Sequence, residues 1–268
     1  MIKRGNTSNL GAEASDSHRS RQDCLMLPGT DFFLEACCTS VEEVLRAQKG
    51  GASRIELCTS LECGGLTPPP ELLQRVKTAV DIPVNVLVRP GYAEGRVTLA
   101  WDGGTGFDNI SQYVFSADES GRLLEQIALM REAGADGIVA GALTPDGEVD
   151  LPLLRRIVAA AAPLPVTFHK AFDACREPFE ALEQIISAGC ARILSSGCAA
   201  SVADGIRTLS SLIRRADGRI IIMPGGGIRP SNIAGIISVI GAARADNAPR
   251  AACATEFHAS AAYFQGEA

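Results

Sequence analysis

The sequence predicts an α/β fold in which eight parallel strands close into one (β/α)8 barrel. Two short patterns that mark strands alternate along its 268 residues. In the first, a glycine ends a helix and a short apolar strand begins at once, as in residues 133–139 and 188–194. In the second, a proline opens the strand, as Pro83 and Pro165 do. Amphipathic stretches between the strands predict helices at residues 41–49, 70–79, 119–132, 151–161, 178–187, 200–214 and 231–240.

Strict alternation of strands and helices joined by short links implies parallel strands with right-handed crossovers. Strands expected at residues 32–37 and 255–258 complete a set of eight, against seven helices. A doubly wound open sheet fits the same alternation. The count of eight strands and the charged residues inside them favour a closed barrel of the TIM type.

One barrel domain is expected over residues 31–261, and the length of the chain is ordinary for a barrel of this kind. Residues 1–30 are polar and predict a disordered N-terminal tail. Residues 91–111 predict a long inserted loop, and residues 262–268 a short C-terminal tail. Since the sequence stops soon after the eighth strand, the final helix of the outer ring is expected to be missing. An apolar flank of that strand would then be exposed unless a partner subunit covers it.

Composition argues against several classes of function. The net charge is −6 and the pI about 5.2, with no basic stripe, which counts against nucleic-acid binding. No run of 18 apolar residues occurs, and the first residues lack the apolar core of a signal peptide, so no membrane or export role is expected. Nine cysteines without an export signal indicate reduced thiols in the cytoplasm rather than a disulfide framework.

Five ionisable residues lie in or at the ends of predicted strands: Glu35, Glu56, Arg89, His169 and Glu256. A parallel strand buried on both faces should be continuously apolar, and a buried charge is costly unless it is paired. These side chains are therefore expected to converge inside the barrel mouth, where barrel enzymes place their catalytic groups. They are the candidate catalytic residues. A purely structural cluster of ion pairs would give the same sequence pattern.

Two cysteines also lie at the strand ends. Alternation along a strand places Cys37 on the same side as Glu35, and Cys58 on the same side as Glu56. Neighbouring strands are about 4.8 Å apart, so two such sulfurs could reach one ion. Two thiolates suit a soft ion such as Cu(I), and suit Zn(II) less well because zinc favours four ligands. The alternative is that both cysteines are small core residues. Cys38 should face the opposite way, into the layer between strands and helices.

A glycine-rich segment follows the seventh strand. Gly225, Gly226 and Gly227 would let backbone N–H groups approach an anion, and many barrels hold phosphate at this position. Ser196 is expected nearby, after the sixth strand. A tight turn that needs positive φ and binds nothing is the alternative reading. His258, which alternates with Glu256, could be a ligand, a proton-transfer group or a paired core histidine.

Several runs in this sequence together resemble the CutC copper homeostasis proteins, in order from about residue 32 to residue 261. The runs are Phe33-Leu34-Glu35-Ala36-Cys37, Arg54-Ile55-Glu56-Leu57-Cys58, Gly64-Gly65-Leu66-Thr67-Pro68, residues 166–173, Ser196-Gly197-Cys198, residues 223–228 and residues 254–260. The resemblance implies a cytoplasmic barrel, a homo-oligomer such as a dimer or tetramer, that handles copper and binds Cu(I). The two cysteines proposed for copper in that family match Cys37 and Cys58. No enzymatic reaction is established for the family.

Two other functions fit the sequence. One is a barrel lyase or isomerase acting on a small phosphorylated or anionic metabolite. In that case Arg89 and the loop at residues 225–227 would hold the anion, while Glu35, Glu56 and His169 would move protons. The other is a scaffold barrel that works only through an oligomer surface.

Overall fold

The structure, a computed structural model, describes residues 32–91, 107–242 and 256–265. The expected N-terminal tail, most of the expected loop at residues 91–111 and the last three residues lie outside these ranges.

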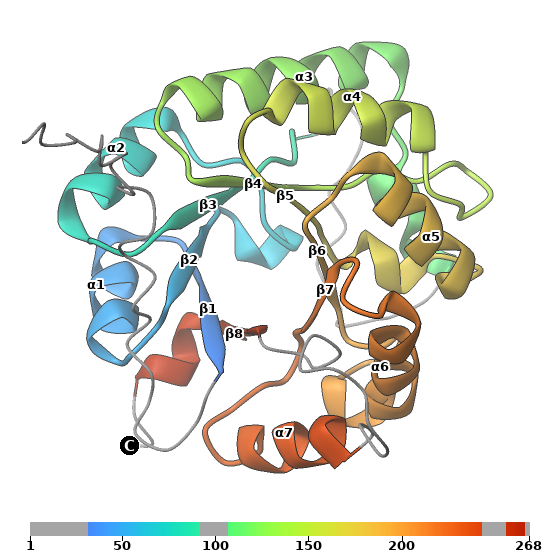
Figure 1. Ribbon diagram of the computed structural model, residues 1–268. Helices are drawn as coiled ribbons and strands as arrows, with labels where there is room; N and C mark the ends of the chain where they lie inside the picture. Colours follow the sequence, from blue (N-terminus) through green and yellow to red (C-terminus); the bar gives the residue numbers. More distant parts are fainter. Residues whose placement is uncertain (1–31, 92–106, 243–255, 266–268) are drawn as a thin grey trace, which may run out of the picture.

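The eight expected strands form one parallel sheet in the order β7-β6-β5-β4-β3-β2-β1-β8. A parallel bridge between Gly225 and His258 joins the two ends of this order and closes the barrel (Figure 1). The prediction of a closed barrel rather than an open sheet is therefore confirmed. The strands are β1 (Phe33–Cys38), β2 (Arg54–Leu57), β3 (Val84–Leu87), β4 (Gly137–Ala140), β5 (Val166–Phe168), β6 (Arg192–Ser195), β7 (Ile221–Pro224) and β8 (Glu256–Ser260).

The described ranges contain seven α-helices outside the strands, and each begins and ends within two residues of its expected bounds. Serine caps explain several of the starts: the Ser40 and Ser201 hydroxyls accept hydrogen bonds from N–H groups in the first turns of their helices. Ser116 and Glu119 form a reciprocal capping box. The helices are α1 (Val41–Lys49), α2 (Pro70–Ala79), α3 (Ala117–Glu132), α4 (Leu151–Ala161), α5 (Pro178–Ala188), α6 (Val202–Ala216) and α7 (Ile233–Ala242). No helix in the described ranges is long and apolar enough to span a membrane.

The alternation along β1 divides its side chains between two layers. Cys38 is fully buried in the large apolar layer between the strands and the helices, as expected. Cys37 faces the inside of the barrel and packs in a separate small cluster with Cys58, Leu87 and Val139. The outer face of β1 therefore packs against the helices, and its inner face contributes to the candidate site.

The outer flank of β8 is covered, and the expectation of an exposed apolar flank is wrong. Phe257 and Ala259 are only 1% and 2% exposed. The chain continues after β8 as a 3-10 turn, η5 (Ala261–Phe264), which packs against α1, β1 and β8. The ring of Phe264 approaches Gly50 so closely that an added Cβ there would lie 2.9 Å from it. A short aromatic turn thus takes over part of the role of an eighth helix, which the described residues do not contain.

Candidate functional site

A cavity of about 780 Å³ opens at the C-terminal ends of the strands. This is the end of the barrel at which barrel enzymes bind their ligands. Cys37 and Cys58 line one part of it, and Gly226 and Gly227 line another. The thiol pair and the glycine-rich loop therefore share one cavity.

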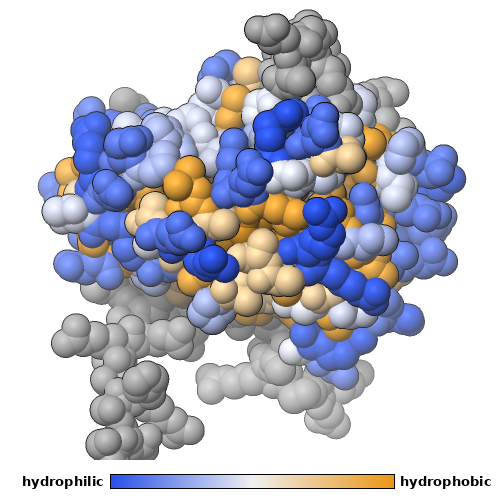
Figure 2. All heavy atoms as spheres, turned by 90° about the horizontal axis from the view of Figure 1, so that it is seen from above, coloured by the Kyte–Doolittle hydropathy of each residue, from blue (hydrophilic) through white to orange (hydrophobic). Residues whose placement is uncertain are grey.

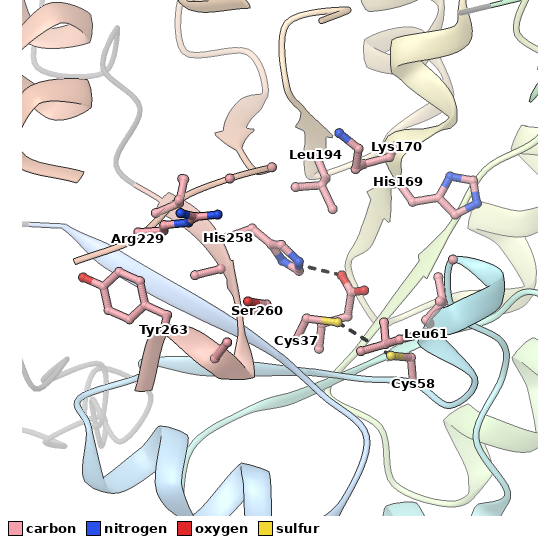
Figure 3. Close-up of a pocket in the computed structure, with 18 of the residues that line it drawn as sticks. Cys37, Cys58, Leu61, His169, Lys170, Leu194, Arg229, His258, Ser260 and Tyr263 are labelled. Atoms are coloured by element: carbon pink, nitrogen blue, oxygen red, sulfur yellow. Dashed lines mark hydrogen bonds and ion pairs between the residues drawn. The ribbon is translucent and has the colours of Figure 1, made fainter. Parts of the chain in front are cut away.

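The two thiols lie side by side on neighbouring strands (Figure 3). The Cys37 and Cys58 sulfurs are 3.6 Å apart, and both residues are buried free cysteines. The register explains this proximity: Cys37 stands opposite Glu56, and the Cys58 N–H donates to the Cys38 carbonyl at 3.1 Å. The hydrogen bond to Cys58, followed by burial, raises the pKa of the Cys37 thiol well above its ordinary value. Cys37 is therefore a neutral thiol at neutral pH.

Glu56 and His258 stand beside Cys37. One ligand atom from each of the three residues lies within 4.8 Å of the other two. His258 Nδ1 is 3.8 Å from the Glu56 carboxylate and 2.9 Å from Oε1 of Glu35. Burial opposes a charge on His258, but Glu56, Cys37 and Glu35 together raise the pKa of its imidazole well above the ordinary value. The ring is therefore a cation between two carboxylates.

Glu56 has an unusual environment for a carboxylate. It is only 5% exposed, and its Oε2 atom has no hydrogen-bond partner among the described residues. Burial raises the pKa of Glu56 to about 7, although nearby His258 works in the opposite direction. A buried acceptor without a partner is costly, so this oxygen is suited to a ligand, a metal or a proton.

Glu35 and Glu256 do not line the cavity, which corrects part of the expectation that all five ionisable residues meet at the mouth. They form a buried ion-pair network with two arginines. Arg54 binds Glu35 through Nε and Glu256 at 2.7 Å, and Arg192 binds Glu256 at 2.6 Å. Burial tends to raise the pKa of Glu35, but Arg54 and His258 hold it at about 2. This network is the structural cluster that the sequence left open as an alternative.

Arg89 and His169 do line the cavity. The Arg89 guanidinium donates to the carbonyls of Cys63 and Gly65 and to the Gln112 side chain, and no described carboxylate pairs with it. Burial, followed by the charge of Arg89, lowers the pKa of His169 to about 3. His169 is thus neutral, and its Nδ1 accepts a hydrogen bond from the Ala171 N–H.

The glycine-rich loop after β7 meets the loop after β6, as expected. The Gly225 N–H donates to the Ser195 carbonyl, and a Cβ at Gly226 would lie 3.3 Å from the Ser196 side chain. Ser196 and Gly225 do not line the cavity, whereas Gly226 and Gly227 do. Only the second half of the loop is therefore available to a ligand.

The sequence reading missed three groups that shape the site. Two of them are Arg54 and Arg192, and the position of Arg54 gives a signal, since it is two residues before Glu56 and so lies on the same face of β2. Arg229 lines the cavity from just after the glycine-rich loop, where nothing but its position signals a role.

Comparison with known proteins gives a consistent family assignment. A model described as the CutC family matches residues 32–97 and 109–249. The copper homeostasis protein cutC homolog of Mus musculus is 42% identical over 233 residues, covering 87% of this chain and 75% of that protein. The Homo sapiens homolog is 41% identical over 230 residues, covering 86% and 73%.

Solved structures agree on the fold. A crystal structure described as copper homeostasis protein CutC from Streptococcus agalactiae has a TM-score of 0.70 at 24% identity, covering 86% of this chain and 98% of that one. A protein described as QR15, an aldolase, has a TM-score of 0.57 at 14% identity, covering 89% and 94%. At these identities the likeness concerns the barrel alone.

Proposed function

Because the chain belongs to the CutC family, we propose that it acts in copper homeostasis by binding Cu(I) through the Cys37 and Cys58 thiolates. The observation that carries the proposal is the sulfur separation of 3.6 Å inside a cavity open at the barrel mouth. Soft thiolate ligands select Cu(I) over the hard cations that prefer oxygen.

The sulfur separation also indicates how many ligands the ion would have. With metal–thiolate bonds of about 2.3 Å, a separation of 3.6 Å corresponds to an S–metal–S angle of about 100°. A linear two-ligand site would need a separation of about 4.6 Å. The pair as it stands suits an ion with at least one further ligand. The Glu56 carboxylate supplies a donor atom for that position.

The surrounding charges support the same assignment. Two thiolates and one Cu(I) ion carry a net charge of −1, and burying such a charge is costly unless a cation lies near it. Protonated His258 is that cation, and the hydrogen bond to Glu35 fixes its position. Arg54 in turn binds Glu35, so the ion pairs inside the barrel fix the orientation of His258 beside the thiols.

A competition titration tests this proposal. Cu(I) is titrated into the full chain in the presence of a chelator of known affinity, under anaerobic conditions. We expect tight binding of one ion, and a loss of at least about 100-fold in affinity in the Cys37→Ser, Cys58→Ser double variant. The matched control is Cys175→Ser with Cys198→Ser, which removes two thiols from another part of the barrel. Unchanged affinity in the first double variant would refute the assignment.

A barrel enzyme is the second candidate function, and the size of the cavity favours it. A volume of about 780 Å³ is that of a small-molecule site and far exceeds the space that one metal ion needs. Glu56 is then the candidate proton-transfer group, since its pKa of about 7 lies near the operating pH. His169, with a pKa of about 3, is a weak base, and Glu35 is committed to Arg54 and His258.

We also propose that the protein works in the cytoplasm as a homo-oligomer. All seven cysteines in the described ranges are free thiols, which fits a reducing compartment. The face over α3 and α4 has hydrophobic residues at its centre with hydrophilic residues around them (Figure 2), and Leu129 of α3 is 46% exposed. Native mass spectrometry, which reports subunit number and bound metal together, tests this; a monomer at micromolar concentration would refute it.

A further inference from the structure

The geometry points to a second binding site in the same cavity, for the phosphate group of a small phosphorylated molecule. The site is formed by Gly226 and Gly227 with the cationic side chains of Lys170 and Arg229. It is distinct from the thiol pair and does not depend on copper. Three features support this site: the charge of the cavity, the backbone of the loop, and the pairing of the cations.

The charge of the cavity is opposite in sign to that of the whole protein. The chain carries a net charge of −6, yet the described residues that line the cavity include Arg89, Lys170 and Arg229 and one carboxylate, Glu56. Lys170 is paired with Asp173, which does not line the cavity. A cleft lined by one sign of charge concentrates ligands of the opposite sign. A Cu⁺ ion would gain nothing from three positive side chains, so these residues indicate an anionic ligand.

The backbone of the loop is shaped for close approach. Gly226 and Gly227 have φ values of 122° and 74°, a region that L-residues with side chains rarely adopt. The Gly225 N–H is already bonded to the Ser195 carbonyl. The N–H groups of Gly226 and Gly227, by contrast, have no acceptor among the described residues. Consecutive free N–H groups beside a cavity form a nest for an anion, as in other phosphate sites.

Of the two cations beside the loop, only Lys170 has a carboxylate partner in the described part of the chain, Asp173. Lys170 Nζ donates to Asp173 and to the Ser196 hydroxyl, each at 2.9 Å, and lies 3.4 Å from where a Gly226 Cβ would be. Asp173 also accepts hydrogen bonds from both hydroxyls and two backbone N–H groups of the β6 loop, so its charge is widely shared. Arg229 has no ion-pair partner in the described part of the chain. Arg229 can therefore bind a phosphate without breaking an ion pair. Lys170 keeps its salt bridge to Asp173, and the third N–H of its ammonium group is left for a phosphate oxygen.

The opposite end of the cavity indicates what the rest of the ligand carries. Glu56 Oε2 is a buried acceptor that has no hydrogen-bond partner among the described residues, with His258 Nδ1 3.8 Å away, so a hydroxyl or similar donor on the ligand would satisfy it. Inorganic phosphate is much smaller than a cavity of about 780 Å³. The ligand class is therefore a small phosphorylated molecule that bears hydroxyl groups, with its phosphate on the loop and its organic part toward the thiols.

The experiment is isothermal titration calorimetry on the metal-free full chain at constant ionic strength. The probes are inorganic phosphate and glycerol 1-phosphate. We expect saturable binding of both, with the glycerol ester tighter because its hydroxyls reach further into the cavity. Arg229→Gln should weaken phosphate binding about tenfold, since a charge-assisted hydrogen bond is lost. The matched control, Arg156→Gln, changes the same charge at an exposed position of α4 and should leave the affinity unchanged.

Three outcomes would overturn the inference. They are the absence of saturable binding of either probe, an equal effect of Arg229→Gln and Arg156→Gln, and binding of the glycerol ester no tighter than that of inorganic phosphate. The Cys37→Ser, Cys58→Ser variant should bind inorganic phosphate as the unaltered protein does, because the phosphate lies on the loop and not at the thiols. That result separates this site from copper binding, because Arg229→Gln tests the phosphate site and the double cysteine variant tests the copper site.

Discussion

Arg54 holds together the buried ion-pair network inside the barrel. The Arg54→Met variant would measure how much this network contributes to the free energy of unfolding. Arg54 is 4% exposed and binds two carboxylates, Glu35 and Glu256. It is the main reason that the pKa of fully buried Glu35 is about 2 instead of 4.5. A shift of that size corresponds to about 3 kcal/mol in favour of the charged form. Removing one member of a buried ion pair costs about 3 to 5 kcal/mol in general.

We expect a loss near the lower limit, about 3 kcal/mol, because Arg192 still binds Glu256 and His258 still binds Glu35. The assay is urea-induced unfolding followed by far-UV circular dichroism at pH 7. With a slope of about 2–3 kcal/mol/M, the midpoint should fall by roughly 1 M.

The control for this variant is Arg219→Met. Arg219 binds Glu183 at 2.6 Å, and together with Arg215 it also holds the pKa of that carboxylate at about 2. This pair lies at the surface, where water and salt screen the charges, so its removal should have a much smaller effect. Equal midpoint shifts in the two variants would show that burial is not what makes the Arg54 network matter, and would refute this reasoning.

Two further predictions concern the loop and the neutral histidine. Gly225→Ala would place a Cβ 2.4 Å from the Leu194 side chain, so it should lower the melting temperature and weaken Cu(I) binding; Gly235→Ala, with nothing within 4 Å in α7, should do neither. His169 is neutral in the folded protein, with a pKa of about 3 against 6.5 when unfolded, so protonation favours unfolding as the pH falls from 6.5 toward 3. His169→Gln, whose side-chain oxygen can still accept from the Ala171 N–H, should therefore lose about 2 kcal/mol less stability than the unaltered protein between pH 7 and pH 5. Parallel losses in urea titrations at the two pH values would show that His169 does not titrate in this way.

The sequence predicted the barrel well because its signals are local. Serines such as Ser40 and Ser201 begin helices, and Gly189 ends α5 with φ of 89°, whatever the rest of the chain does. Strand alternation likewise sufficed to place Cys37 inside the barrel and Cys38 outside it. These are properties of short segments, so a single sequence displays them.

The parts of the site that the sequence did not predict depend on partners far along the chain. Glu35 and Glu256 are charged strand residues like Glu56, yet Arg54 and Arg192 neutralise them below the cavity. Which carboxylate has an arginine beside it depends on the register of strands that are distant in sequence. The cover of β8 was missed for a related reason. Four residues of η5 were too few to read as a helix, and their packing on α1 follows only from the closed barrel.

X-ray absorption spectroscopy of the copper-loaded protein tests the central claim most directly. We expect a Cu(I) edge and two sulfur neighbours, from Cys37 and Cys58, with a third neighbour that is an oxygen of Glu56. The sulfur signal should disappear in the Cys37→Ser, Cys58→Ser variant and persist in the Cys175→Ser, Cys198→Ser control. Copper that is surrounded by nitrogen and oxygen alone, or that keeps its sulfur signal without Cys37 and Cys58, would contradict the account.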